Sequence, residues 1–348
     1  MSTRPDRSDP AIVVSDLEKR FTGWKRGGRL RRERHDVEAV AGVSFRVARG
    51  EMLGYVGPNG AGKSTTIKML TGVLVPTSGD VHVNGLVPAQ QRVQLARRIG
   101  VVFGQRSLLW WDLPLRESFR LLRHIYGVAP APHAERLAEC AELLQLDEFL
   151  DTPVRQLSLG QRMRGELTAA LLHDPEILFL DEPTIGLDVV SKARVRTFLA
   201  DLNSRRGTTV LLTTHDLADI ERLCSRLLII DHGRVIYDGA LEALRERHGT
   251  RRMVVVDFTE PIAPVDLAPA EVVKVDGPRQ WLRFRRDDLT ASELIARLVA
   301  RYPVRDLTIE EPAVEDIVRD IYTGGIALDP SAGAGEPRAS GDQPASSP

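Results

Sequence analysis

The sequence predicts an α/β fold in which helices cover a mostly parallel sheet. Short apolar runs alternate with helical patterns from residue 11 to about residue 249. A glycine-rich segment directly follows one of these runs, and open α/β sheets bind ligands beyond the carboxyl ends of their strands. Each of the clearest strand candidates ends near a turn or a polar residue; they are 52–56, 99–103, 177–180, 209–213 and 227–230.

A second, smaller α+β domain is expected at 250–323, after a first domain at 11–249. Its pattern predicts strands near 253–258, 272–275 and 281–285, then a helix at 292–301, a strand near Leu307 and a helix at 313–322. Residues 1–10 are expected to be disordered. The same holds for 324–348, which is rich in Gly, Ala, Ser and Pro and has little to bury against its ordering entropy.

Composition narrows the possible partners and location. The formal net charge of -1 over 348 residues gives no overall field that would attract nucleic acid or an anionic membrane, so any such contact would be local and the charge alone leaves the partners open. No nucleic-acid partner is expected. Cys140 and Cys224 are the only cysteines and lie far apart, which favours a reducing, cytoplasmic compartment over a disulfide framework or zinc site. No apolar run approaches the roughly 18 to 20 residues that span a bilayer, so a transport path would need another chain.

Residues 57–64 match the pattern GxxxxGK[ST] between a predicted strand and a helical pattern, a context that argues against an ordinary glycine-rich turn. In such a loop the backbone N–H groups and the helix N-terminus surround phosphate oxygens. Lys63 is expected to bridge the β and γ phosphates, and Ser64 to ligate Mg²⁺. The predicted nucleotide-binding residues are Gly57, Pro58, Asn59, Gly60, Ala61, Gly62, Lys63, Ser64 and Thr65.

Two acids follow the predicted strand 177–180, in the arrangement called Walker B. Asp181 is expected to hold Mg²⁺ through water, and Glu182 to face the attacking water as general base. Alone, such a pair could equally be a solvated strand end. The phosphate loop favours the catalytic interpretation.

Residues 157–161, LSLGQ, resemble the LSGGQ signature of ABC ATPases, and further family markers follow in the family's order. Gln105 resembles the Q-loop, which contributes to the Mg²⁺ site; Asp188 lies in a segment similar to the D-loop, and His215 resembles the catalytic H-loop switch. The resemblance covers about 11–249. It implies a P-loop NTPase with a RecA-like core, a helical subdomain at about 106–175 and an antiparallel β subdomain.

The same resemblance implies that two chains enclose ATP between them. Ser158, Gly160 and Gln161 of one subunit would close over nucleotide held by the phosphate loop of the other, most simply in a homodimer. Leu159 departs from the family, where Gly is commonest, but Ser158 and Gly160 are kept, so activity is expected. Phe21 falls where the family stacks an aromatic ring on adenine, and Trp24 is a competitor for that role.

Two features have alternative interpretations. The first is a basic insertion, which is either a solvated loop or a contact with lipid head groups or a partner; it contains Lys25, Arg26, Arg29, Arg31, Arg32 and Arg34. The second is the adjacent pair Trp110 and Trp111. One of them is expected in the core, and one is a candidate to cap the socket for a coupling helix of the permease.

The motif forms at 57–72 and 180–188, with the added C-terminal domain, are similar to ATPases of bacterial ABC-2-type exporters. This implies an ATP- and Mg²⁺-dependent ATPase on the cytoplasmic face of the cell membrane, attached to separate permease subunits. An importer ATPase shares the motif core and remains an alternative.

A non-transport ABC ATPase is a more distant alternative. It would carry two such domains or a long inserted coiled coil, and neither is visible in the sequence. A regulatory module without turnover would be expected to lack Glu182 or His215, and both are present.

Overall fold

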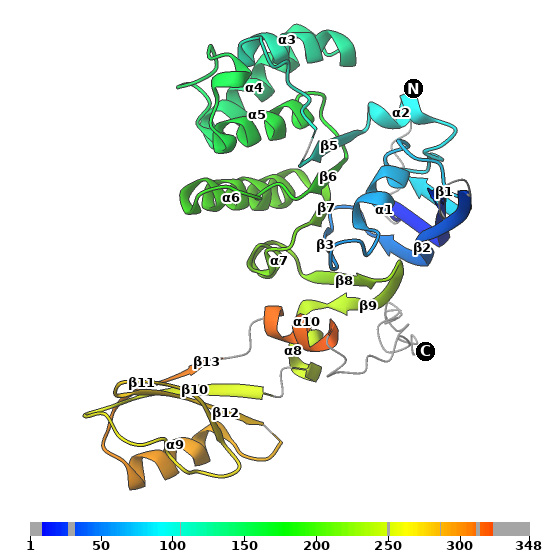
Figure 1. Ribbon diagram of the computed structural model, residues 1–348. Helices are drawn as coiled ribbons and strands as arrows, with labels where there is room; N and C mark the ends of the chain where they lie inside the picture. The colour runs from blue at the N-terminus through cyan, green and yellow to red at the C-terminus, as the bar shows by residue number, and fades with distance from the viewer. Residues whose placement is uncertain are drawn as a thin grey trace, which may run out of the picture.

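The computed structural model describes residues 9–26, 32–104, 106–248, 251–285, 287–310 and 314–322. Within these residues the strands form three sheets, with helices around the largest of them (Figure 1). This is the predicted α/β architecture with an antiparallel β subdomain. The disorder predicted for 1–10 and 324–348 falls outside the described residues, except at Asp9 and Pro10, which lie in neither helix nor strand.

The largest sheet has the strand order β5-β6-β7-β3-β8-β9. Five strands run parallel, and β9 pairs antiparallel with β8. Every residue of β3 and β7 is buried, as expected for strands with both faces covered. The strands are β3 (Met52–Val56), β5 (Ile99–Phe103), β6 (Ile177–Asp181), β7 (Thr209–Thr213), β8 (Arg226–Asp231) and β9 (Arg234–Ala240).

The five predicted strands of this sheet are present, each with bounds within one residue of the prediction. The sequence did not predict β9, because none of its residues is fully buried and its apolar run is short. The helices beside the sheet are α1 (Lys63–Leu70), α2 (Arg92–Ala96), α6 (Val189–Arg206), α7 (Leu217–Leu223) and α8 (Leu241–His248).

A separate group of helices lies between β5 and β6 in the chain and stands above the sheet in Figure 1. It shares one apolar core with the sheet, since Leu115, Phe119 and Leu167 belong to the same buried cluster as Leu180. Its elements are α3 (Leu115–Tyr126), α4 (Pro130–Leu144), a short 3₁₀ turn (Val154–Gln156) and α5 (Leu159–Leu171).

Neither Trp110 nor Trp111 is in the core, so the prediction that one of them is buried was wrong. Their exposed fractions are 37% and 54%, and the chain forms a turn here rather than a helix. Leu109, which is buried, takes the core position instead. Both indole rings are therefore available at the surface of the helical group.

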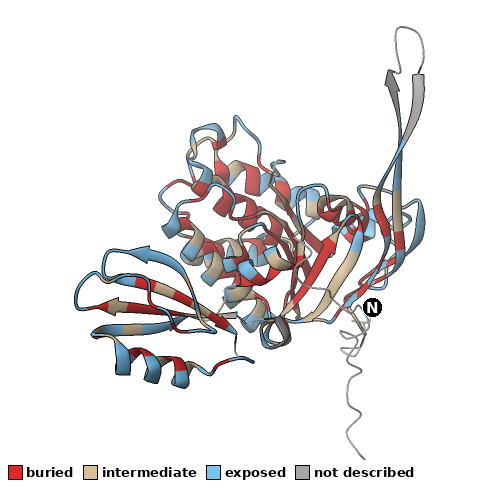
Figure 2. Cartoon of the chain, turned by 60° about the horizontal axis from the view of Figure 1, so that its bottom comes forward, coloured by how far each residue is buried: buried red, intermediate tan, exposed pale blue. Residues whose placement is uncertain are grey.

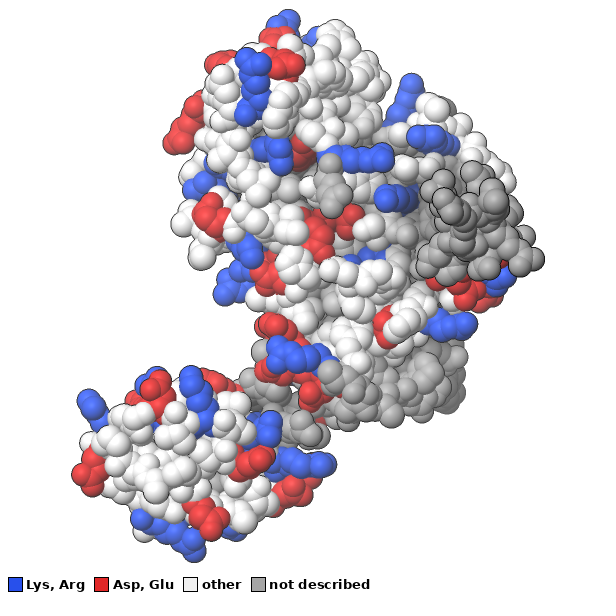
Figure 3. All heavy atoms as spheres, in the orientation of Figure 1, with Lys and Arg blue, Asp and Glu red and all other residues white. Residues whose placement is uncertain are grey.

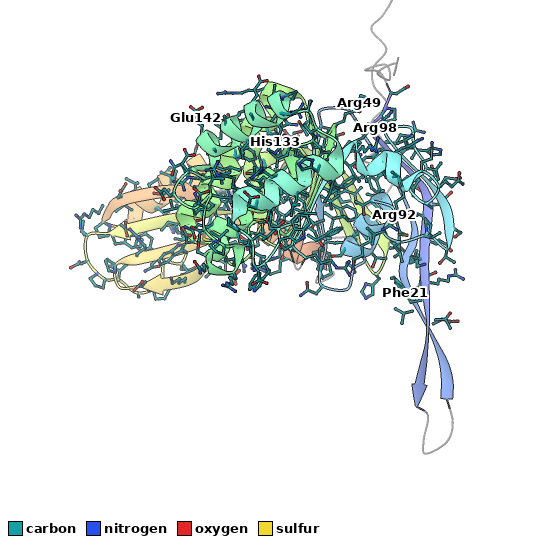
Figure 4. All side chains as sticks on the ribbon, turned by 90° about the horizontal axis from the view of Figure 1, so that it is seen from above. Phe21, Arg49, Arg92, Arg98, His133 and Glu142 are labelled. Carbon is teal, nitrogen blue, oxygen red and sulfur yellow. The ribbon has the colours of Figure 1, made fainter. Side chains whose placement is uncertain are left out.

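The three-stranded antiparallel sheet contains a long hairpin. Its strands are β1 (Ile12–Arg26), β2 (Arg32–Val47) and β4 (Ser78–Val83), in the order β2-β1-β4. Figure 2 shows buried residues in the part of the hairpin nearest to the rest of the molecule, and Figure 4 shows the hairpin, which carries Phe21, extending to one side.

The β1–β2 ladder continues into both ends of the basic insertion, so these ends are paired strand rather than loop. Arg26 pairs with Arg32, and Trp24 pairs with Arg34. The predicted basic residues Arg29 and Arg31 lie outside the described part of the chain. The contact of the basic insertion with lipid head groups or a partner stays a prediction.

The C-terminal unit is a four-stranded antiparallel sheet with one helix. Its core joins the sheet residues Val254 and Leu282 to Leu294 and Leu298 of the helix. The strand order is β11-β12-β10-β13. The elements are β10 (Arg251–Phe258), β11 (Glu271–Asp276), β12 (Arg279–Arg285), α9 (Ala291–Arg301) and β13 (Val304–Glu310).

The last helix, α10 (Val314–Tyr322), leaves this unit and packs against α7 and α8 (Figure 1). Its apolar face joins the buried cluster of the large sheet through Val314, Ile317, Val318 and Ile321. The division at residue 250 stays a prediction. No helix in the described ranges is both long and apolar enough to cross a membrane.

Candidate active site

A cleft of about 920 Å³ lies where β3, β5, β6 and β7 end. Figure 3 shows acidic side chains near the centre of this face of the molecule, with basic side chains around them. The predicted residues that line the cleft are Asn59, Gly60, Gly62, Lys63, Ser64, Thr65, Asp181, Glu182 and His215. The strand order therefore brings together motifs that are more than a hundred residues apart in the sequence.

The glycine-rich loop passes from β3 into α1 through Gly62. This residue has a φ of 106°, and a Cβ added to it would lie 2.4 Å from the carbonyl oxygen of Ala39. Glycine is therefore required at this position. Lys63, Ser64 and Thr65 open α1, so their N–H groups have no carbonyl partner within the helix and carry its partial positive charge.

Lys63 is buried, and its ammonium group points back into the loop. Its Nζ donates to the carbonyl oxygens of Gly57 and Pro58, the second at 3.1 Å. Burial lowers the pKa of Lys63, and the nearby carboxylates of Glu182 and Asp181 oppose that change. The lysine thus lies between the loop and both acids.

Asp181, at the end of β6, gathers hydroxyl groups from two other elements. Its Oδ1 accepts a hydrogen bond from Thr213 Oγ1 at 2.7 Å and a longer one from Ser64 Oγ at 3.4 Å. Thr213 ends β7, the neighbouring strand, and was not predicted as a site residue. A threonine closing an apolar strand was the available signal, but only the strand order identifies its partner.

Glu182 follows β6 with a φ of 58°, in the left-handed region that is uncommon for residues other than glycine. Its N–H donates to the carbonyl oxygen of Thr213 at 2.9 Å, which fixes this conformation. Its Oε2 lies 2.6 Å from Nδ1 of His215 and also accepts from the His215 N–H at 3.3 Å. The structure therefore pairs the two residues predicted to be catalytic.

Phe21 does not line the cleft, although it lies on the hairpin beside it. Its ring is 42% exposed, and Lys19 Nζ lies 5.3 Å from the ring centroid (Figure 4). Phe21 pairs with Val37 on the neighbouring strand. Ala39, two residues further along that strand, lines the cleft. Phe21 is thus partly exposed and lies close in the sheet to a residue that lines the cleft.

Gln105 lies outside the described residues. Its neighbour Arg106 lines the cleft, as does Lys68 of α1, and neither was predicted. A basic residue beside a predicted metal-facing glutamine was the signal for Arg106. Two further positive charges therefore face a cleft that is suited to phosphate.

The signature residues lie away from the cleft of their own chain. Ser158 caps α5, where its Oγ accepts from the Gln161 N–H at 3.2 Å and its own N–H donates to Gln161 Oε1 at 2.9 Å. A Cβ on Gly160 would lie 2.7 Å from Ser191 Oγ, so the start of α5 contacts the start of α6. Asp188 caps α6 by accepting from the Ser191 N–H at 2.9 Å.

Comparisons with known proteins agree with this geometry. The sequence pattern of the family described as "ABC transporter" matches residues 40–185, and that of the "EvrA-like ABC transporter, C-terminal domain" matches 250–310. The daunorubicin resistance ATP-binding protein DrrA3 of Streptomyces coeruleorubidus is 33% identical over 89% of this chain and 95% of its own. The ABC transporter ATP-binding protein NatA of Bacillus subtilis is 32% identical over 68% of this chain and 92% of its own.

A third relative is the Nod factor export ATP-binding protein I of Rhizobium sp. strain N33, which is 38% identical over 81% of this chain and 91% of its own. Among solved structures, an ATP-binding subunit of an ABC transporter superposes with a TM-score of 0.59 at 30% identity, covering 69% of this chain and 93% of that one. A dimeric ATP-binding cassette in a post-hydrolysis state with ADP and Pi superposes with a TM-score of 0.57 at 27% identity, covering 66% and 98%. The chain belongs to the ABC transporter ATP-binding protein family and is the ATPase subunit of an ABC transporter.

Proposed function

We propose that this chain hydrolyses ATP as one of an identical pair and that closure of the pair drives export through separate permease subunits. The observation that carries the proposal is the contact between Glu182 and His215 in the same cleft as Lys63, Ser64 and Asp181. In this set Lys63 can bind phosphate, the oxygen atoms of Ser64 and Asp181 can bind a cation, and Glu182 is an acid in contact with His215. Each has a distinct role in phosphoryl transfer.

Lys63 and the first N–H groups of α1 would bind the β and γ phosphates of ATP. The two loop carbonyl oxygens that Lys63 now contacts compete poorly with phosphate, because a charged acceptor makes the stronger hydrogen bond. Arg106 and Lys68 add positive charge at the cleft wall. Phe21 would stack on adenine at the edge of the cleft.

The residues present fit Mg²⁺. Ser64 Oγ and Asp181 Oδ1 are hard oxygen donors that already lie within 3.4 Å of each other and face the cleft. Gln105 would add a third oxygen. When bound, the cation neutralises charge on the phosphates. Thr213 orients the Asp181 carboxylate.

Glu182 would accept the proton of the water that attacks the γ phosphate. Its carboxylate is held by the His215 imidazole and the His215 N–H, so its orientation is set before the reaction. The His215 side chain is 62% exposed and lines the cleft, where it would steady the γ phosphate of bound ATP.

Pairing follows from the position of the signature. Ser158, Gly160 and Gln161 lie away from the cleft of their own chain, so they would act on nucleotide held by a second copy. Beside them lies an apolar surface whose side chains are 40% to 83% exposed and which would be covered by that copy: Leu159, Ile185, Val189 and Val190. The solved dimeric cassette with ADP and Pi is consistent with this arrangement.

The helical group is the proposed contact for the permease. Trp110 and Trp111 stand exposed where the chain enters this group, and Leu121 and Ile125 of α3 are 38% and 62% exposed. Exposed tryptophans are frequent anchors of interfaces. Attachment there would place the chain on the cytoplasmic face of the membrane, and the names of DrrA3 and the Nod factor protein favour export over import.

The test is steady-state ATP hydrolysis by the purified complex carrying Glu182→Gln. The variant keeps the size and hydrogen-bonding shape of the side chain but cannot accept the proton, so the rate should fall by about 10²-fold or more. Exchange of an exposed acid, Glu142→Gln on α4, is the control and should leave the rate unchanged. An unchanged rate in Glu182→Gln would overturn the catalytic assignment.

A further inference from the structure

Glu166 is a buried carboxylate in the middle of α5 that the proposed mechanism leaves without a role. Its side chain is 5% exposed. One oxygen accepts a short hydrogen bond from the Ser107 hydroxyl, and the other accepts from the Leu108 N–H at 2.9 Å. Ser107 and Leu108 belong to the connection between β5 and α3, so Glu166 joins that connection to the helix that begins at the signature.

Packing around Glu166 makes this junction tight. Ser107 Oγ also accepts from the Leu109 N–H at 3.0 Å, which orders the turn before α3. The residue next to Glu166 is Gly165, where an added Cβ would lie 2.8 Å from Leu115 Cδ1 and 3.2 Å from Leu109 Cδ1. A side chain at position 165 would therefore collide with Leu115, and α5 packs closely here against the start of α3 and the end of the connection.

The bond to Glu166 is costly to open. Burial raises the pKa of Glu166, while its bonds to Ser107 and Leu108 favour the charged form. Hydrogen bonds to an ionised acceptor are stronger than neutral ones, and a carboxylate deprived of its donors would stay buried without a partner. The junction should therefore persist while larger segments move.

The junction connects the two parts of the chain that would contact ATP in the proposed pair, the chain's own cleft and its signature. The connection follows residue 105, the expected metal-facing glutamine, and its first described residue, Arg106, lines the cleft. At the other end, α5 begins at Ser158, which would meet ATP on the second copy.

We propose that Glu166 is a positioning residue of the ATPase cycle. It holds the 106–109 connection and α5 as one body, so that nucleotide in the cleft of one chain sets the position of that chain's own signature. This inference rests on the proposed function, and it adds the element that links the two ATP sites of a pair. Glu166 itself touches neither nucleotide nor metal.

The experiment compares Glu166→Ala, Glu166→Gln and Ser107→Ala in the full-length chain, with Glu142→Ala as the exposed control. Two quantities are measured: affinity for a fluorescent ATP analogue and the turnover number for ATP. Glu166→Ala should keep nucleotide affinity within about twofold while turnover falls about tenfold or more, and Ser107→Ala should show the same split to a smaller extent. Glu166→Gln retains an acceptor for Leu108 and a donor for Ser107, so it should recover most of the turnover.

A second measurement covers the case in which Glu166→Ala folds poorly. In a Glu182→Gln background, ATP should produce pairs of the parent chain but fewer pairs when Ser107→Ala is added, at equal thermal unfolding temperature. A merely structural role would lower the unfolding temperature without separating affinity from turnover, and that result would overturn the inference.

The wild-type chain separates this inference from the proposed function. If wild type hydrolyses ATP and Glu166→Ala matches it in turnover, only the role of Glu166 is wrong. If wild type does not hydrolyse ATP, or hydrolyses it at a rate that Glu182→Gln leaves unchanged, the proposed function itself is wrong.

Discussion

At the scale of single residues, the cleft depends on side chains that meet only because neighbouring strands end at the same edge. Asp181 ends β6 and Thr213 ends β7, and the threonine hydroxyl donates to the carboxylate at 2.7 Å. Thr213 is fully buried, so no water replaces this bond when the hydroxyl is removed. Its contribution should appear in the binding of the cation rather than of the nucleotide.

Thr213→Val tests this contribution. Valine has the same shape, so the fold should be kept at a cost of about 1 kcal/mol for the lost hydrogen bond. The Mg²⁺ concentration for half-maximal ATP hydrolysis should rise several-fold, because Asp181 loses the group that orients it. The matched control is Thr209→Val at the other end of β7, where the hydroxyl accepts from the Gly50 N–H. If both variants show the same Mg²⁺ dependence, Thr213 only stabilises the fold.

The residues of the site were predictable where the chemistry lies in consecutive positions. The run from Gly57 to Ser64 and the pair after strand 177–180 each carry their own spacing, and parallel strands place both at one edge. Thr213 was missed because its partner, Asp181, comes from another strand, and no local pattern identifies such a partner. Neither adjacent tryptophan is buried, because the chain turns there instead of forming a helix.

At the scale of elements, the helical group is joined to the large sheet partly through His173. This residue follows α5, and its ring stacks on Tyr126 at the end of α3 with centroids 4.0 Å apart. Its Nε2 donates to the carbonyl oxygen of Ile99 at 2.8 Å, which ties the loop to the start of β5. The neutral imidazole is the form that fits this site.

Acidification should weaken this join. Burial lowers the pKa of His173 below its ordinary value of 6.5, so its contribution to the free energy of unfolding is complete above pH 6.5 and is lost as pH falls through the lower value in the folded state. His173→Gln keeps an N–H donor and does not titrate, so its unfolding temperature should depend less on pH below 6.5. Exchange of the exposed His124 for Gln should leave the wild-type pH profile unchanged. Parallel profiles for wild type and His173→Gln would count against this role.

The elements of the large sheet could be predicted because buried parallel strands are continuous apolar runs. The strand β9 and the outer part of the β1–β2 hairpin could not, since one is partly exposed and the other is rich in charge. In the hairpin, ladder pairing with the opposite strand overrides the weak strand preference of the basic residues.

At the scale of the whole molecule, the C-terminal unit is held to the large sheet through α10. The pattern at 313–322 predicted a helix with one apolar face, but such a pattern does not identify the surface against which that face packs. In the structure that surface is α7, which follows His215, and Glu221 of α7 accepts a hydrogen bond from the Val314 N–H at 2.7 Å. The last helix thus rests on the helix that begins two residues after His215.

Pairing is the whole-molecule property on which the account depends, because the signature of each chain lies away from its own cleft. The most direct test is the molar mass of the purified Glu182→Gln chain by light scattering, with ATP and with ADP. Slow hydrolysis should trap the closed pair, so the mass should rise from 38.6 kDa to about twice that value with ATP and remain that of one chain with ADP. A mass that stays that of one chain while ATP is bound would contradict the account.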